Sequence, residues 1–138
     1  MMTKADLEKL SNLRLDDAIF LLKENRCSSA YYLAGYSVEL GIKACIAKLV
    51  QPNAIPDKAF VNAIYVHKLD SLIGTAGLKP ELDACMKADT EFAAYWAIAN
   101  NWTEESRYQF WDPFAAASII QAIQEPNHGV FQWVKKHW

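Results

Sequence analysis

The side chains best suited to chemistry lie in an aromatic segment around Arg107, one of only three arginines in the chain. The aromatic residues of this segment are Trp102, Tyr108, Phe110 and Trp111. A guanidinium donates several hydrogen bonds in a fixed geometry that matches a phosphate, and aromatic rings stack on nucleobases. The composition therefore indicates a phosphate or base site, with Arg107, Tyr108 and Trp102 as its contacts.

A second group of polar residues lies in the apolar stretch from Ala30 to Ala44. Glu39 precedes Lys43 by four residues, so the two share one face of a helix with Tyr36. This wall offers an acceptor, a cation and a hydroxyl, a set that suits a nucleotide-like ligand. The same spacing, acid before base, also favours a simple ion pair within the helix. Both interpretations stay open.

Glu39 requires a partner of opposite charge. A helix that is apolar on every side is normally buried, and a buried carboxylate is either paired or neutralised. Arg107 is the cation that we expect to reach it from elsewhere in the chain. Two compatible roles for Arg107 follow: it neutralises Glu39 as a structural ion pair, or it presents its donors to a ligand phosphate.

The elements that position these residues are helices, because no segment shows a clear alternation of period two. Thr3 and Asp112 are suitable N-caps, and Pro113 fits the first position of a helix. The long helices that we expect cover residues 3–25, 28–50, 80–100 and 112–124, with short ones at 67–73 and from 127 onward. These counts predict an all-α fold, an antiparallel up-and-down four-helix bundle with one or two short additional helices.

The composition and charge of the chain argue against several classes of protein. The 138 residues (1–138) form one domain, and a net charge of −2 argues against a broad basic face for nucleic acid. No apolar run approaches the roughly 20 residues that a membrane span needs. Three cysteines, an odd number without close pairing, fit a reducing cytoplasm, which is the expected location. The Glu-x-x-His spacing of di-iron bundles occurs once, from Glu125 to His128, but it lacks partner glutamates and Pro126 breaks it, so neither a metal nor a cofactor is expected.

Several segments, taken in order, resemble the HEPN superfamily (higher eukaryotes and prokaryotes nucleotide-binding). The stretch from Ala30 to Ala44 is similar to the family's second helix, in which a carboxylate shortly before a lysine is typical. His67-Lys68-Leu69 looks like the start of its third helix, and Arg107-Tyr108 like the element before its final long helix. Residues 13–18 and 129–136 extend the likeness over most of the chain.

The resemblance implies a small helical bundle that pairs as a homodimer. Some members are metal-independent RNases, frequently toxins, whereas others bind ligands or partner a nucleotidyltransferase. The RNase members carry a His four to six residues after the Arg, but Tyr-Gln-Phe-Trp-Asp-Pro-Phe follows Arg107 here. We therefore assign no catalytic residue. The expected function is a non-catalytic module that binds RNA or a nucleotide, paired with a nucleotidyltransferase in a toxin–antitoxin-like system.

Two other functions stay open. A divergent metal-independent RNase would use Arg107 with a base from elsewhere in the fold, such as His67 or His128. A purely structural bundle would assemble with another protein and bind no nucleotide. Trp133 and Trp138, two of five tryptophans, favour a homodimer interface near the C-terminus, with core packing as the alternative.

Overall fold

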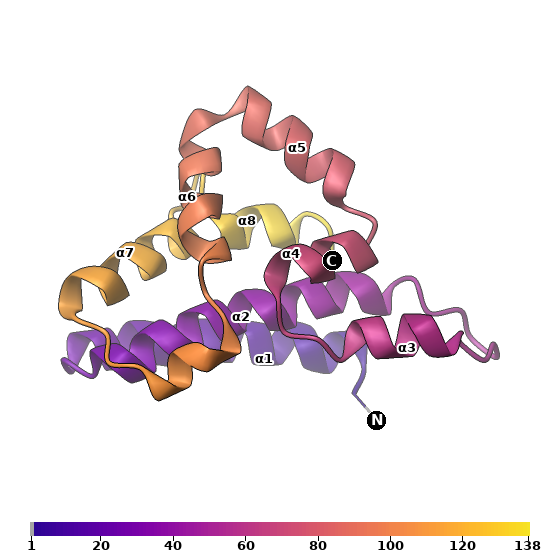
Figure 1. Ribbon diagram of the computed structural model, residues 1–138, viewed down its shortest axis with the longest axis horizontal. Helices are drawn as coiled ribbons and strands as arrows, with labels where there is room; N and C mark the ends of the chain where they lie inside the picture. The colour runs from indigo at the N-terminus through magenta and orange to yellow at the C-terminus, as the bar shows by residue number, and fades with distance from the viewer. Residues whose placement is uncertain (1) are drawn as a thin grey trace.

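The computed structural model of the chain describes residues 2–138 and folds them into helices and their connections. This part of the chain contains no β-strand, which confirms the prediction of an all-α fold. The helices shown in Figure 1 are α1 (Lys4–Lys23), α2 (Cys27–Ala47), α3 (Lys58–Ile64), α4 (Leu69–Thr75), α5 (Lys79–Ala88), α6 (Thr90–Asn100), the 3₁₀ helix η1 (Glu104–Tyr108), α7 (Pro113–Gln124) and α8 (Val130–Lys135). Each helix described here lacks either the length or the apolar character that crossing a membrane requires.

The first two helices form an antiparallel hairpin along the base of the molecule (Figure 1). α1 begins at a capping box, in which the Thr3 hydroxyl accepts from the Asp6 amide and the Asp6 carboxylate accepts from the Thr3 amide. Asn25, in the turn between the helices, has a φ of 60°, a conformation that asparagine tolerates better than most residues. The buried hydroxyl of Ser11 donates to the Ser37 carbonyl over 2.6 Å and fastens α1 to α2.

α2 is the central helix and is buried along most of its length, as its apolar sequence predicts. α4, α7 and α8 pack on it, and α6 stands steeply against α7 in the upper part of the molecule (Figure 1). Large apolar side chains that fill the core around α2 are Ile42, Leu69, Leu72, Phe92, Ile119 and Ile123. A polar side chain on α2 therefore either contacts a neighbouring element or lies at the edge of this core.

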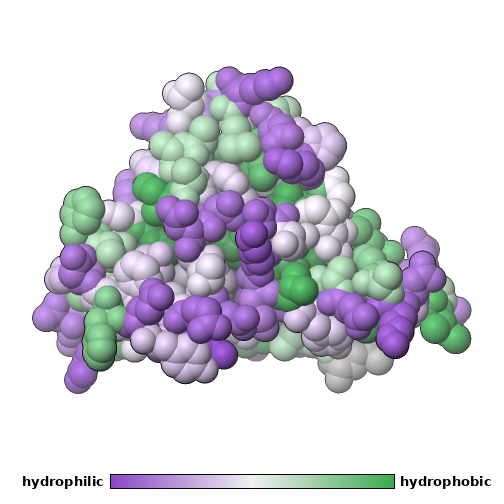
Figure 2. Space-filling model, viewed as in Figure 1, coloured by the Kyte–Doolittle hydropathy of each residue, from purple (hydrophilic) through white to green (hydrophobic). Residues whose placement is uncertain are grey.

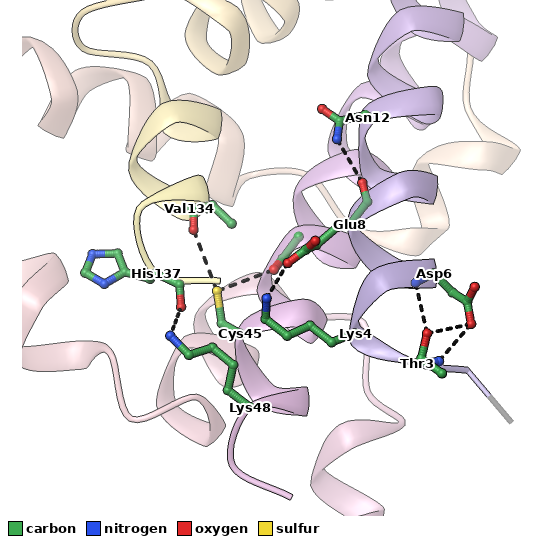
Figure 3. A network of polar contacts seen from close by, with 10 residues as sticks. Thr3, Lys4, Asp6, Glu8, Asn12, Cys45, Lys48, Val134 and His137 are labelled. Carbon is green, nitrogen blue, oxygen red and sulfur yellow. Dashed lines mark hydrogen bonds and ion pairs between the residues drawn. The ribbon is translucent and has the colours of Figure 1, made fainter.

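Polar contacts attach the C-terminal segment to the end of α2 (Figure 3). The Cys45 thiol donates to the Val134 carbonyl over 3.7 Å, and Lys48 Nζ donates to the His137 carbonyl over 3.0 Å. Trp133 is buried within the chain and packs against Phe92. The core-packing alternative therefore accounts for Trp133, which gives no support to an interface.

The boundaries of three elements differ from the prediction. The helix expected over residues 80–100 is two helices, because Asp89 leaves the helical conformation and caps α6 by accepting from the Phe92 amide. Helix α3 was not expected at all. The helix expected from residue 28 begins at Cys27 without a side-chain cap, and the Ser28 hydroxyl accepts from the Trp111 amide over 2.9 Å. This bond fixes the chain between η1 and α7 against the start of α2.

Candidate functional site

Glu39 lies at the centre of a polar cluster at the edge of the core. Its side chain is 2% exposed, and its two oxygens have different partners. Oε1 lies 3.0 Å from His67 Nδ1, and Oε2 lies 3.3 Å from Lys43 Nζ. The other ring nitrogen of His67, Nε2, lies 3.2 Å from Oε2 of Glu104 in η1. The cluster therefore joins α2, the segment before α4, and η1.

The predicted ion pair between Glu39 and Arg107 is wrong. The Glu39 carboxylate pairs with Lys43 and contacts the imidazole of His67 instead. A 3₁₀ helix has three residues per turn, so Glu104 and Arg107 lie on the same side of η1 but one turn apart. Glu104 occupies the turn that faces His67, and Arg107 extends from the next turn toward the start of α2.

Arg107 is exposed, and within residues 2–138 no carboxylate lies within ion-pair distance of it. Its guanidinium carbon lies 5.0 Å from the centroid of the Tyr108 ring. Hydrogen bonding to the side chain of Tyr108, and then to that of Tyr32, raises the pKa of Arg107 above its ordinary value. The guanidinium therefore remains charged and has donors to spare for a ligand.

A shallow hollow of about 250 Å³ lies beside this guanidinium. Its lining residues are Ser28, Ser29, Tyr32, Leu33 and Arg107. The hollow thus combines one cation with three hydroxyls at the N-terminal end of α2, where backbone amides also favour an anion. This donor set can hold a phosphate group.

Trp102 occupies a different place from the one predicted. Its side chain is 1% exposed and cannot stack on a base. Gly35 makes room for the indole, because a Cβ at residue 35 would lie 2.1 Å from Trp102 Cγ. The indole Nε1 donates to the Tyr32 carbonyl over 3.1 Å. Trp102 therefore fixes η1 against α2 and positions the site without contacting a ligand.

Two tyrosines of α2, Tyr32 and Tyr36, lie between Arg107 at one end of the site and the Glu39 cluster at the other. The rings of Tyr32 and Tyr36 are stacked, with centroids 5.9 Å apart and planes 19° apart. Burial and then the charge of Glu39 raise the pKa of Tyr36. The structure thus brings Tyr36, Glu39 and Lys43 onto one helix face, as predicted, and Tyr108 lies at the opposite end beside Arg107.

Residues missing from the predicted site are Ser28, Ser29, Tyr32, His67 and Glu104. The spacing of Tyr32 from Tyr36 and Glu39, four and seven residues, already placed it on the same helix face. His67 was expected to open a short helix, but α4 begins two residues later, at Leu69. Its pairing with Glu39 and Glu104 depends on contacts between distant segments, and no local signal in the sequence indicates it.

The other candidate base, His128, lies elsewhere. Its Nδ1 is 2.7 Å from Asp89 Oδ2 and its Nε2 is 2.9 Å from Glu91 Oε2, which ties the chain before α8 to the start of α6. The hydrogen bond that His128 donates to the Asp89 carboxylate raises the pKa of His128 and lowers the pKa of Asp89. His128 therefore serves this junction. It does not belong to the surface formed by Tyr32, Glu39, Lys43, His67 and η1, which we call the α2–η1 face. Over residues 2–138, no group of three or more His, Cys, Asp and Glu is arranged to hold a metal ion.

The chain matches no protein family, no curated protein and no solved structure. The case for a function therefore depends on the geometry of the α2–η1 face, which offers an exposed guanidinium, hydroxyls and tyrosine rings.

Proposed function

We propose that the chain is a non-catalytic HEPN-type module, built as an antiparallel four-helix bundle, that binds RNA or a nucleotide on its α2–η1 face. The observation that carries the proposal is the exposed Arg107, whose charge is not taken by a carboxylate and which borders a hollow rich in hydroxyls. The HEPN resemblance adds a homodimer and a nucleotidyltransferase partner in a toxin–antitoxin-like system of the cytoplasm.

The bound phosphate would lie in the hollow. Arg107 would donate to two of its oxygens, and the hydroxyls of Ser28, Ser29 and Tyr32 would donate to the others. Tyr108 is 71% exposed beside the guanidinium, so its ring is available to stack on the attached base. Lys43 is 14% exposed and already paired with Glu39, so it adds positive potential more than a direct contact.

The alternative function, a divergent metal-independent RNase, is favoured by one specific observation. His67 lies on the same face as Arg107, because Glu104 contacts His67 and precedes Arg107 by one turn of η1. Glu39 would orient the imidazole through Nδ1, and Nε2, released from Glu104 when the RNA binds, would accept the proton of a 2′-hydroxyl. The 2′-oxygen would form a bond to the phosphorus held by Arg107 while the bond from phosphorus to the 5′-oxygen breaks. The 5′-oxygen would leave with a proton from water, and a 2′,3′-cyclic phosphate would remain. His128 is not part of this alternative, because Asp89 and Glu91 hold it at another junction.

Binding of a fluorescent single-stranded RNA, followed by anisotropy, tests the proposal. We expect Arg107→Ala to weaken binding roughly tenfold or more, equivalent to about 1.4 kcal/mol. Lys87→Ala, which removes an exposed cation from α5, is the matched control and should leave the affinity unchanged. Absence of binding by the unaltered protein, or equal losses in both variants, would refute the proposal.

The same samples, run on a denaturing gel, separate the two functions. The binding module leaves the RNA intact. Cleavage that disappears in both His67→Ala and Arg107→Ala would instead establish the RNase. If the protein neither binds nor cleaves the RNA, the result would favour the third function, a structural bundle that assembles with another protein.

A further inference from the structure

A second surface, distinct from the α2–η1 face, lies between α6 and α7. The two helices border a groove of about 330 Å³, lined by Tyr95, Ile98, Phe114, Ala117, Ser118 and Gln121. Most of this lining is apolar. In Figure 2, green apolar residues stand out at the left edge of the molecule, where α7 begins in Figure 1.

The apolar side chains of the groove are unusually exposed. Phe114 is 81% exposed and Ile98 is 37% exposed, although burial of such side chains is favourable. Phe114 is not needed to start α7, because Asp112 caps this helix by accepting from the Ala115 amide and Pro113 supplies its first residue. Phe114 and Ile98 border the same groove, so a partner seated there would cover both side chains at once.

The charged side chains at the ends of the groove are mostly acidic. Glu91 lies on the face of α6 that carries Tyr95 and Ile98, four and seven residues later, and Asp112 and Glu125 lie at the two ends of α7. His128 contacts Glu91, and Arg107 is the one Lys or Arg between residues 89 and 125. A complementary partner is therefore basic as well as apolar.

We propose that the groove between α6 and α7 docks an amphipathic helix of another protein, one with apolar residues along one face and Lys or Arg on its flanks. The apolar face would cover Phe114 and Ile98, as amphipathic helices do in other hydrophobic grooves. The basic flanks would lie against the acidic side chains at the ends of the groove. The inference does not depend on the function proposed for the α2–η1 face.

The same charges argue against two other occupants. A second copy of the chain, docked through the same groove about a twofold axis, would bring the two acidic sets together. A single-stranded nucleic acid would place its phosphates among these carboxylates. A basic protein segment would bring no negative charge against these carboxylates, so neither repulsion arises.

The test uses a synthetic, fluorescently labelled amphipathic Leu/Lys peptide of about 14 residues, long enough to form a helix when bound. A Leu/Glu peptide of the same pattern is its control. We expect the basic peptide to bind the full chain and the acidic peptide not to bind. Equal binding of the two peptides, or no binding of the basic one, would overturn the proposal.

Paired variants locate the site. Phe114→Ser and Ala117→Lys should each weaken binding of the basic peptide roughly tenfold. Ala117→Glu, a change at the same exposed position with the opposite charge, should preserve or strengthen it. Ile55→Ser, at a residue that is 97% exposed in the connection between α2 and α3, is the control for loss of an exposed apolar side chain elsewhere.

Equal losses in the two Ala117 variants would contradict the charge argument, and an equal loss in Ile55→Ser would contradict the location. Sedimentation of the unlabelled protein completes the test. A dimer that dissociates in Phe114→Ser would show that a second copy occupies the groove, and it would overturn the assignment to another protein. Circular dichroism of each variant establishes that the helices are intact.

Discussion

The α2–η1 face and the α6–α7 groove differ in whether their side chains have partners within the chain. On the first face, most polar groups have partners within the chain: Glu39 holds Lys43 and His67, and His67 reaches Glu104. Arg107 keeps its charge available to solvent. In the groove, Phe114 and Ile98 stay exposed although apolar. On these two surfaces, the groups without a partner inside the chain are Arg107 and the apolar pair Phe114 and Ile98, so these residues are the ones to examine for binding.

The largest expected effect comes from filling the space on which η1 rests. Gly35→Ala should lower the free energy of unfolding by about 3 kcal/mol, because the added Cβ would overlap the Trp102 ring and the overpacked contact cannot relax. Urea unfolding measures the change. Gly74→Ala, where a Cβ would meet no atom within 4 Å, is the matched control. It should leave stability unchanged or raise it by up to about 1 kcal/mol.

Removing the charge at the centre of the polar face should have the next largest effect. Glu39→Gln should cost about 2 kcal/mol, because a buried carboxylate with two charged or ionisable partners is lost. Glu104→Gln should cost less than about 1 kcal/mol, because the Glu104 side chain is 36% exposed and solvent screens its contact with His67. Chemical denaturation of both variants gives the comparison. Equal costs would show that burial does not distinguish the two carboxylates.

The junction between α6 and the chain before α8 should make stability depend on pH. The pKa of Asp89 is lowered in the folded protein, so its contribution is present above its unfolded value of 3.8 and is lost as the pH falls through the folded pKa. The pKa of His128 is raised, so its contribution is present below 6.5 and is lost as the pH rises through the folded pKa.

Thermal unfolding of the unaltered protein and His128→Gln, compared across pH, tests this linkage. The difference in Tm should be largest near about pH 5 and should disappear by about pH 9. A difference that persists unchanged at about pH 9 would mean that the imidazole acts through packing and not through its charge.

The smallest expected effect is a difference in alkylation rate between the thiol of Cys45 in the central helix α2 and that of Cys85 in α5. Burial raises the pKa of Cys45 in α2 to about 11, so little thiolate is present at neutral pH. Burial also raises the pKa of Cys85 in α5, but this side chain is only partly covered. Mass spectrometry after limited alkylation should find Cys85 modified before Cys45. The reverse order would indicate that the end of α2 opens more readily than α5.

Local signals in the sequence were sufficient for the elements that begin at clear caps. Thr3 with Asp6, and Asp112 with Pro113, mark the starts of α1 and α7 as the structure has them. The break at Asp89 was missed because apolar residues continue at helical spacing on both sides of it. An Asp that caps the following helix is a local signal that the periodic pattern concealed.

The sequence was sufficient to identify several residues of the candidate site but not to show which of them contact one another. Helical spacing placed Tyr36, Glu39 and Lys43 on one face, and the burial of α2 correctly required a partner for Glu39. Which cation reaches that carboxylate depends on how η1 turns and on where the chain before α4 passes. His67 rather than Arg107 occupies the position, and only the contacts between distant segments decide this.

Amide chemical-shift mapping of the ¹⁵N-labelled protein during titration with single-stranded RNA shows whether the α2–η1 face binds RNA, because both surfaces report in one experiment. We expect shifts that saturate at Ser28, Tyr32 and Arg107, with Phe114 and Ala117 unchanged. Saturating shifts in the α6–α7 groove, with the α2–η1 face unaffected, would contradict the proposed function.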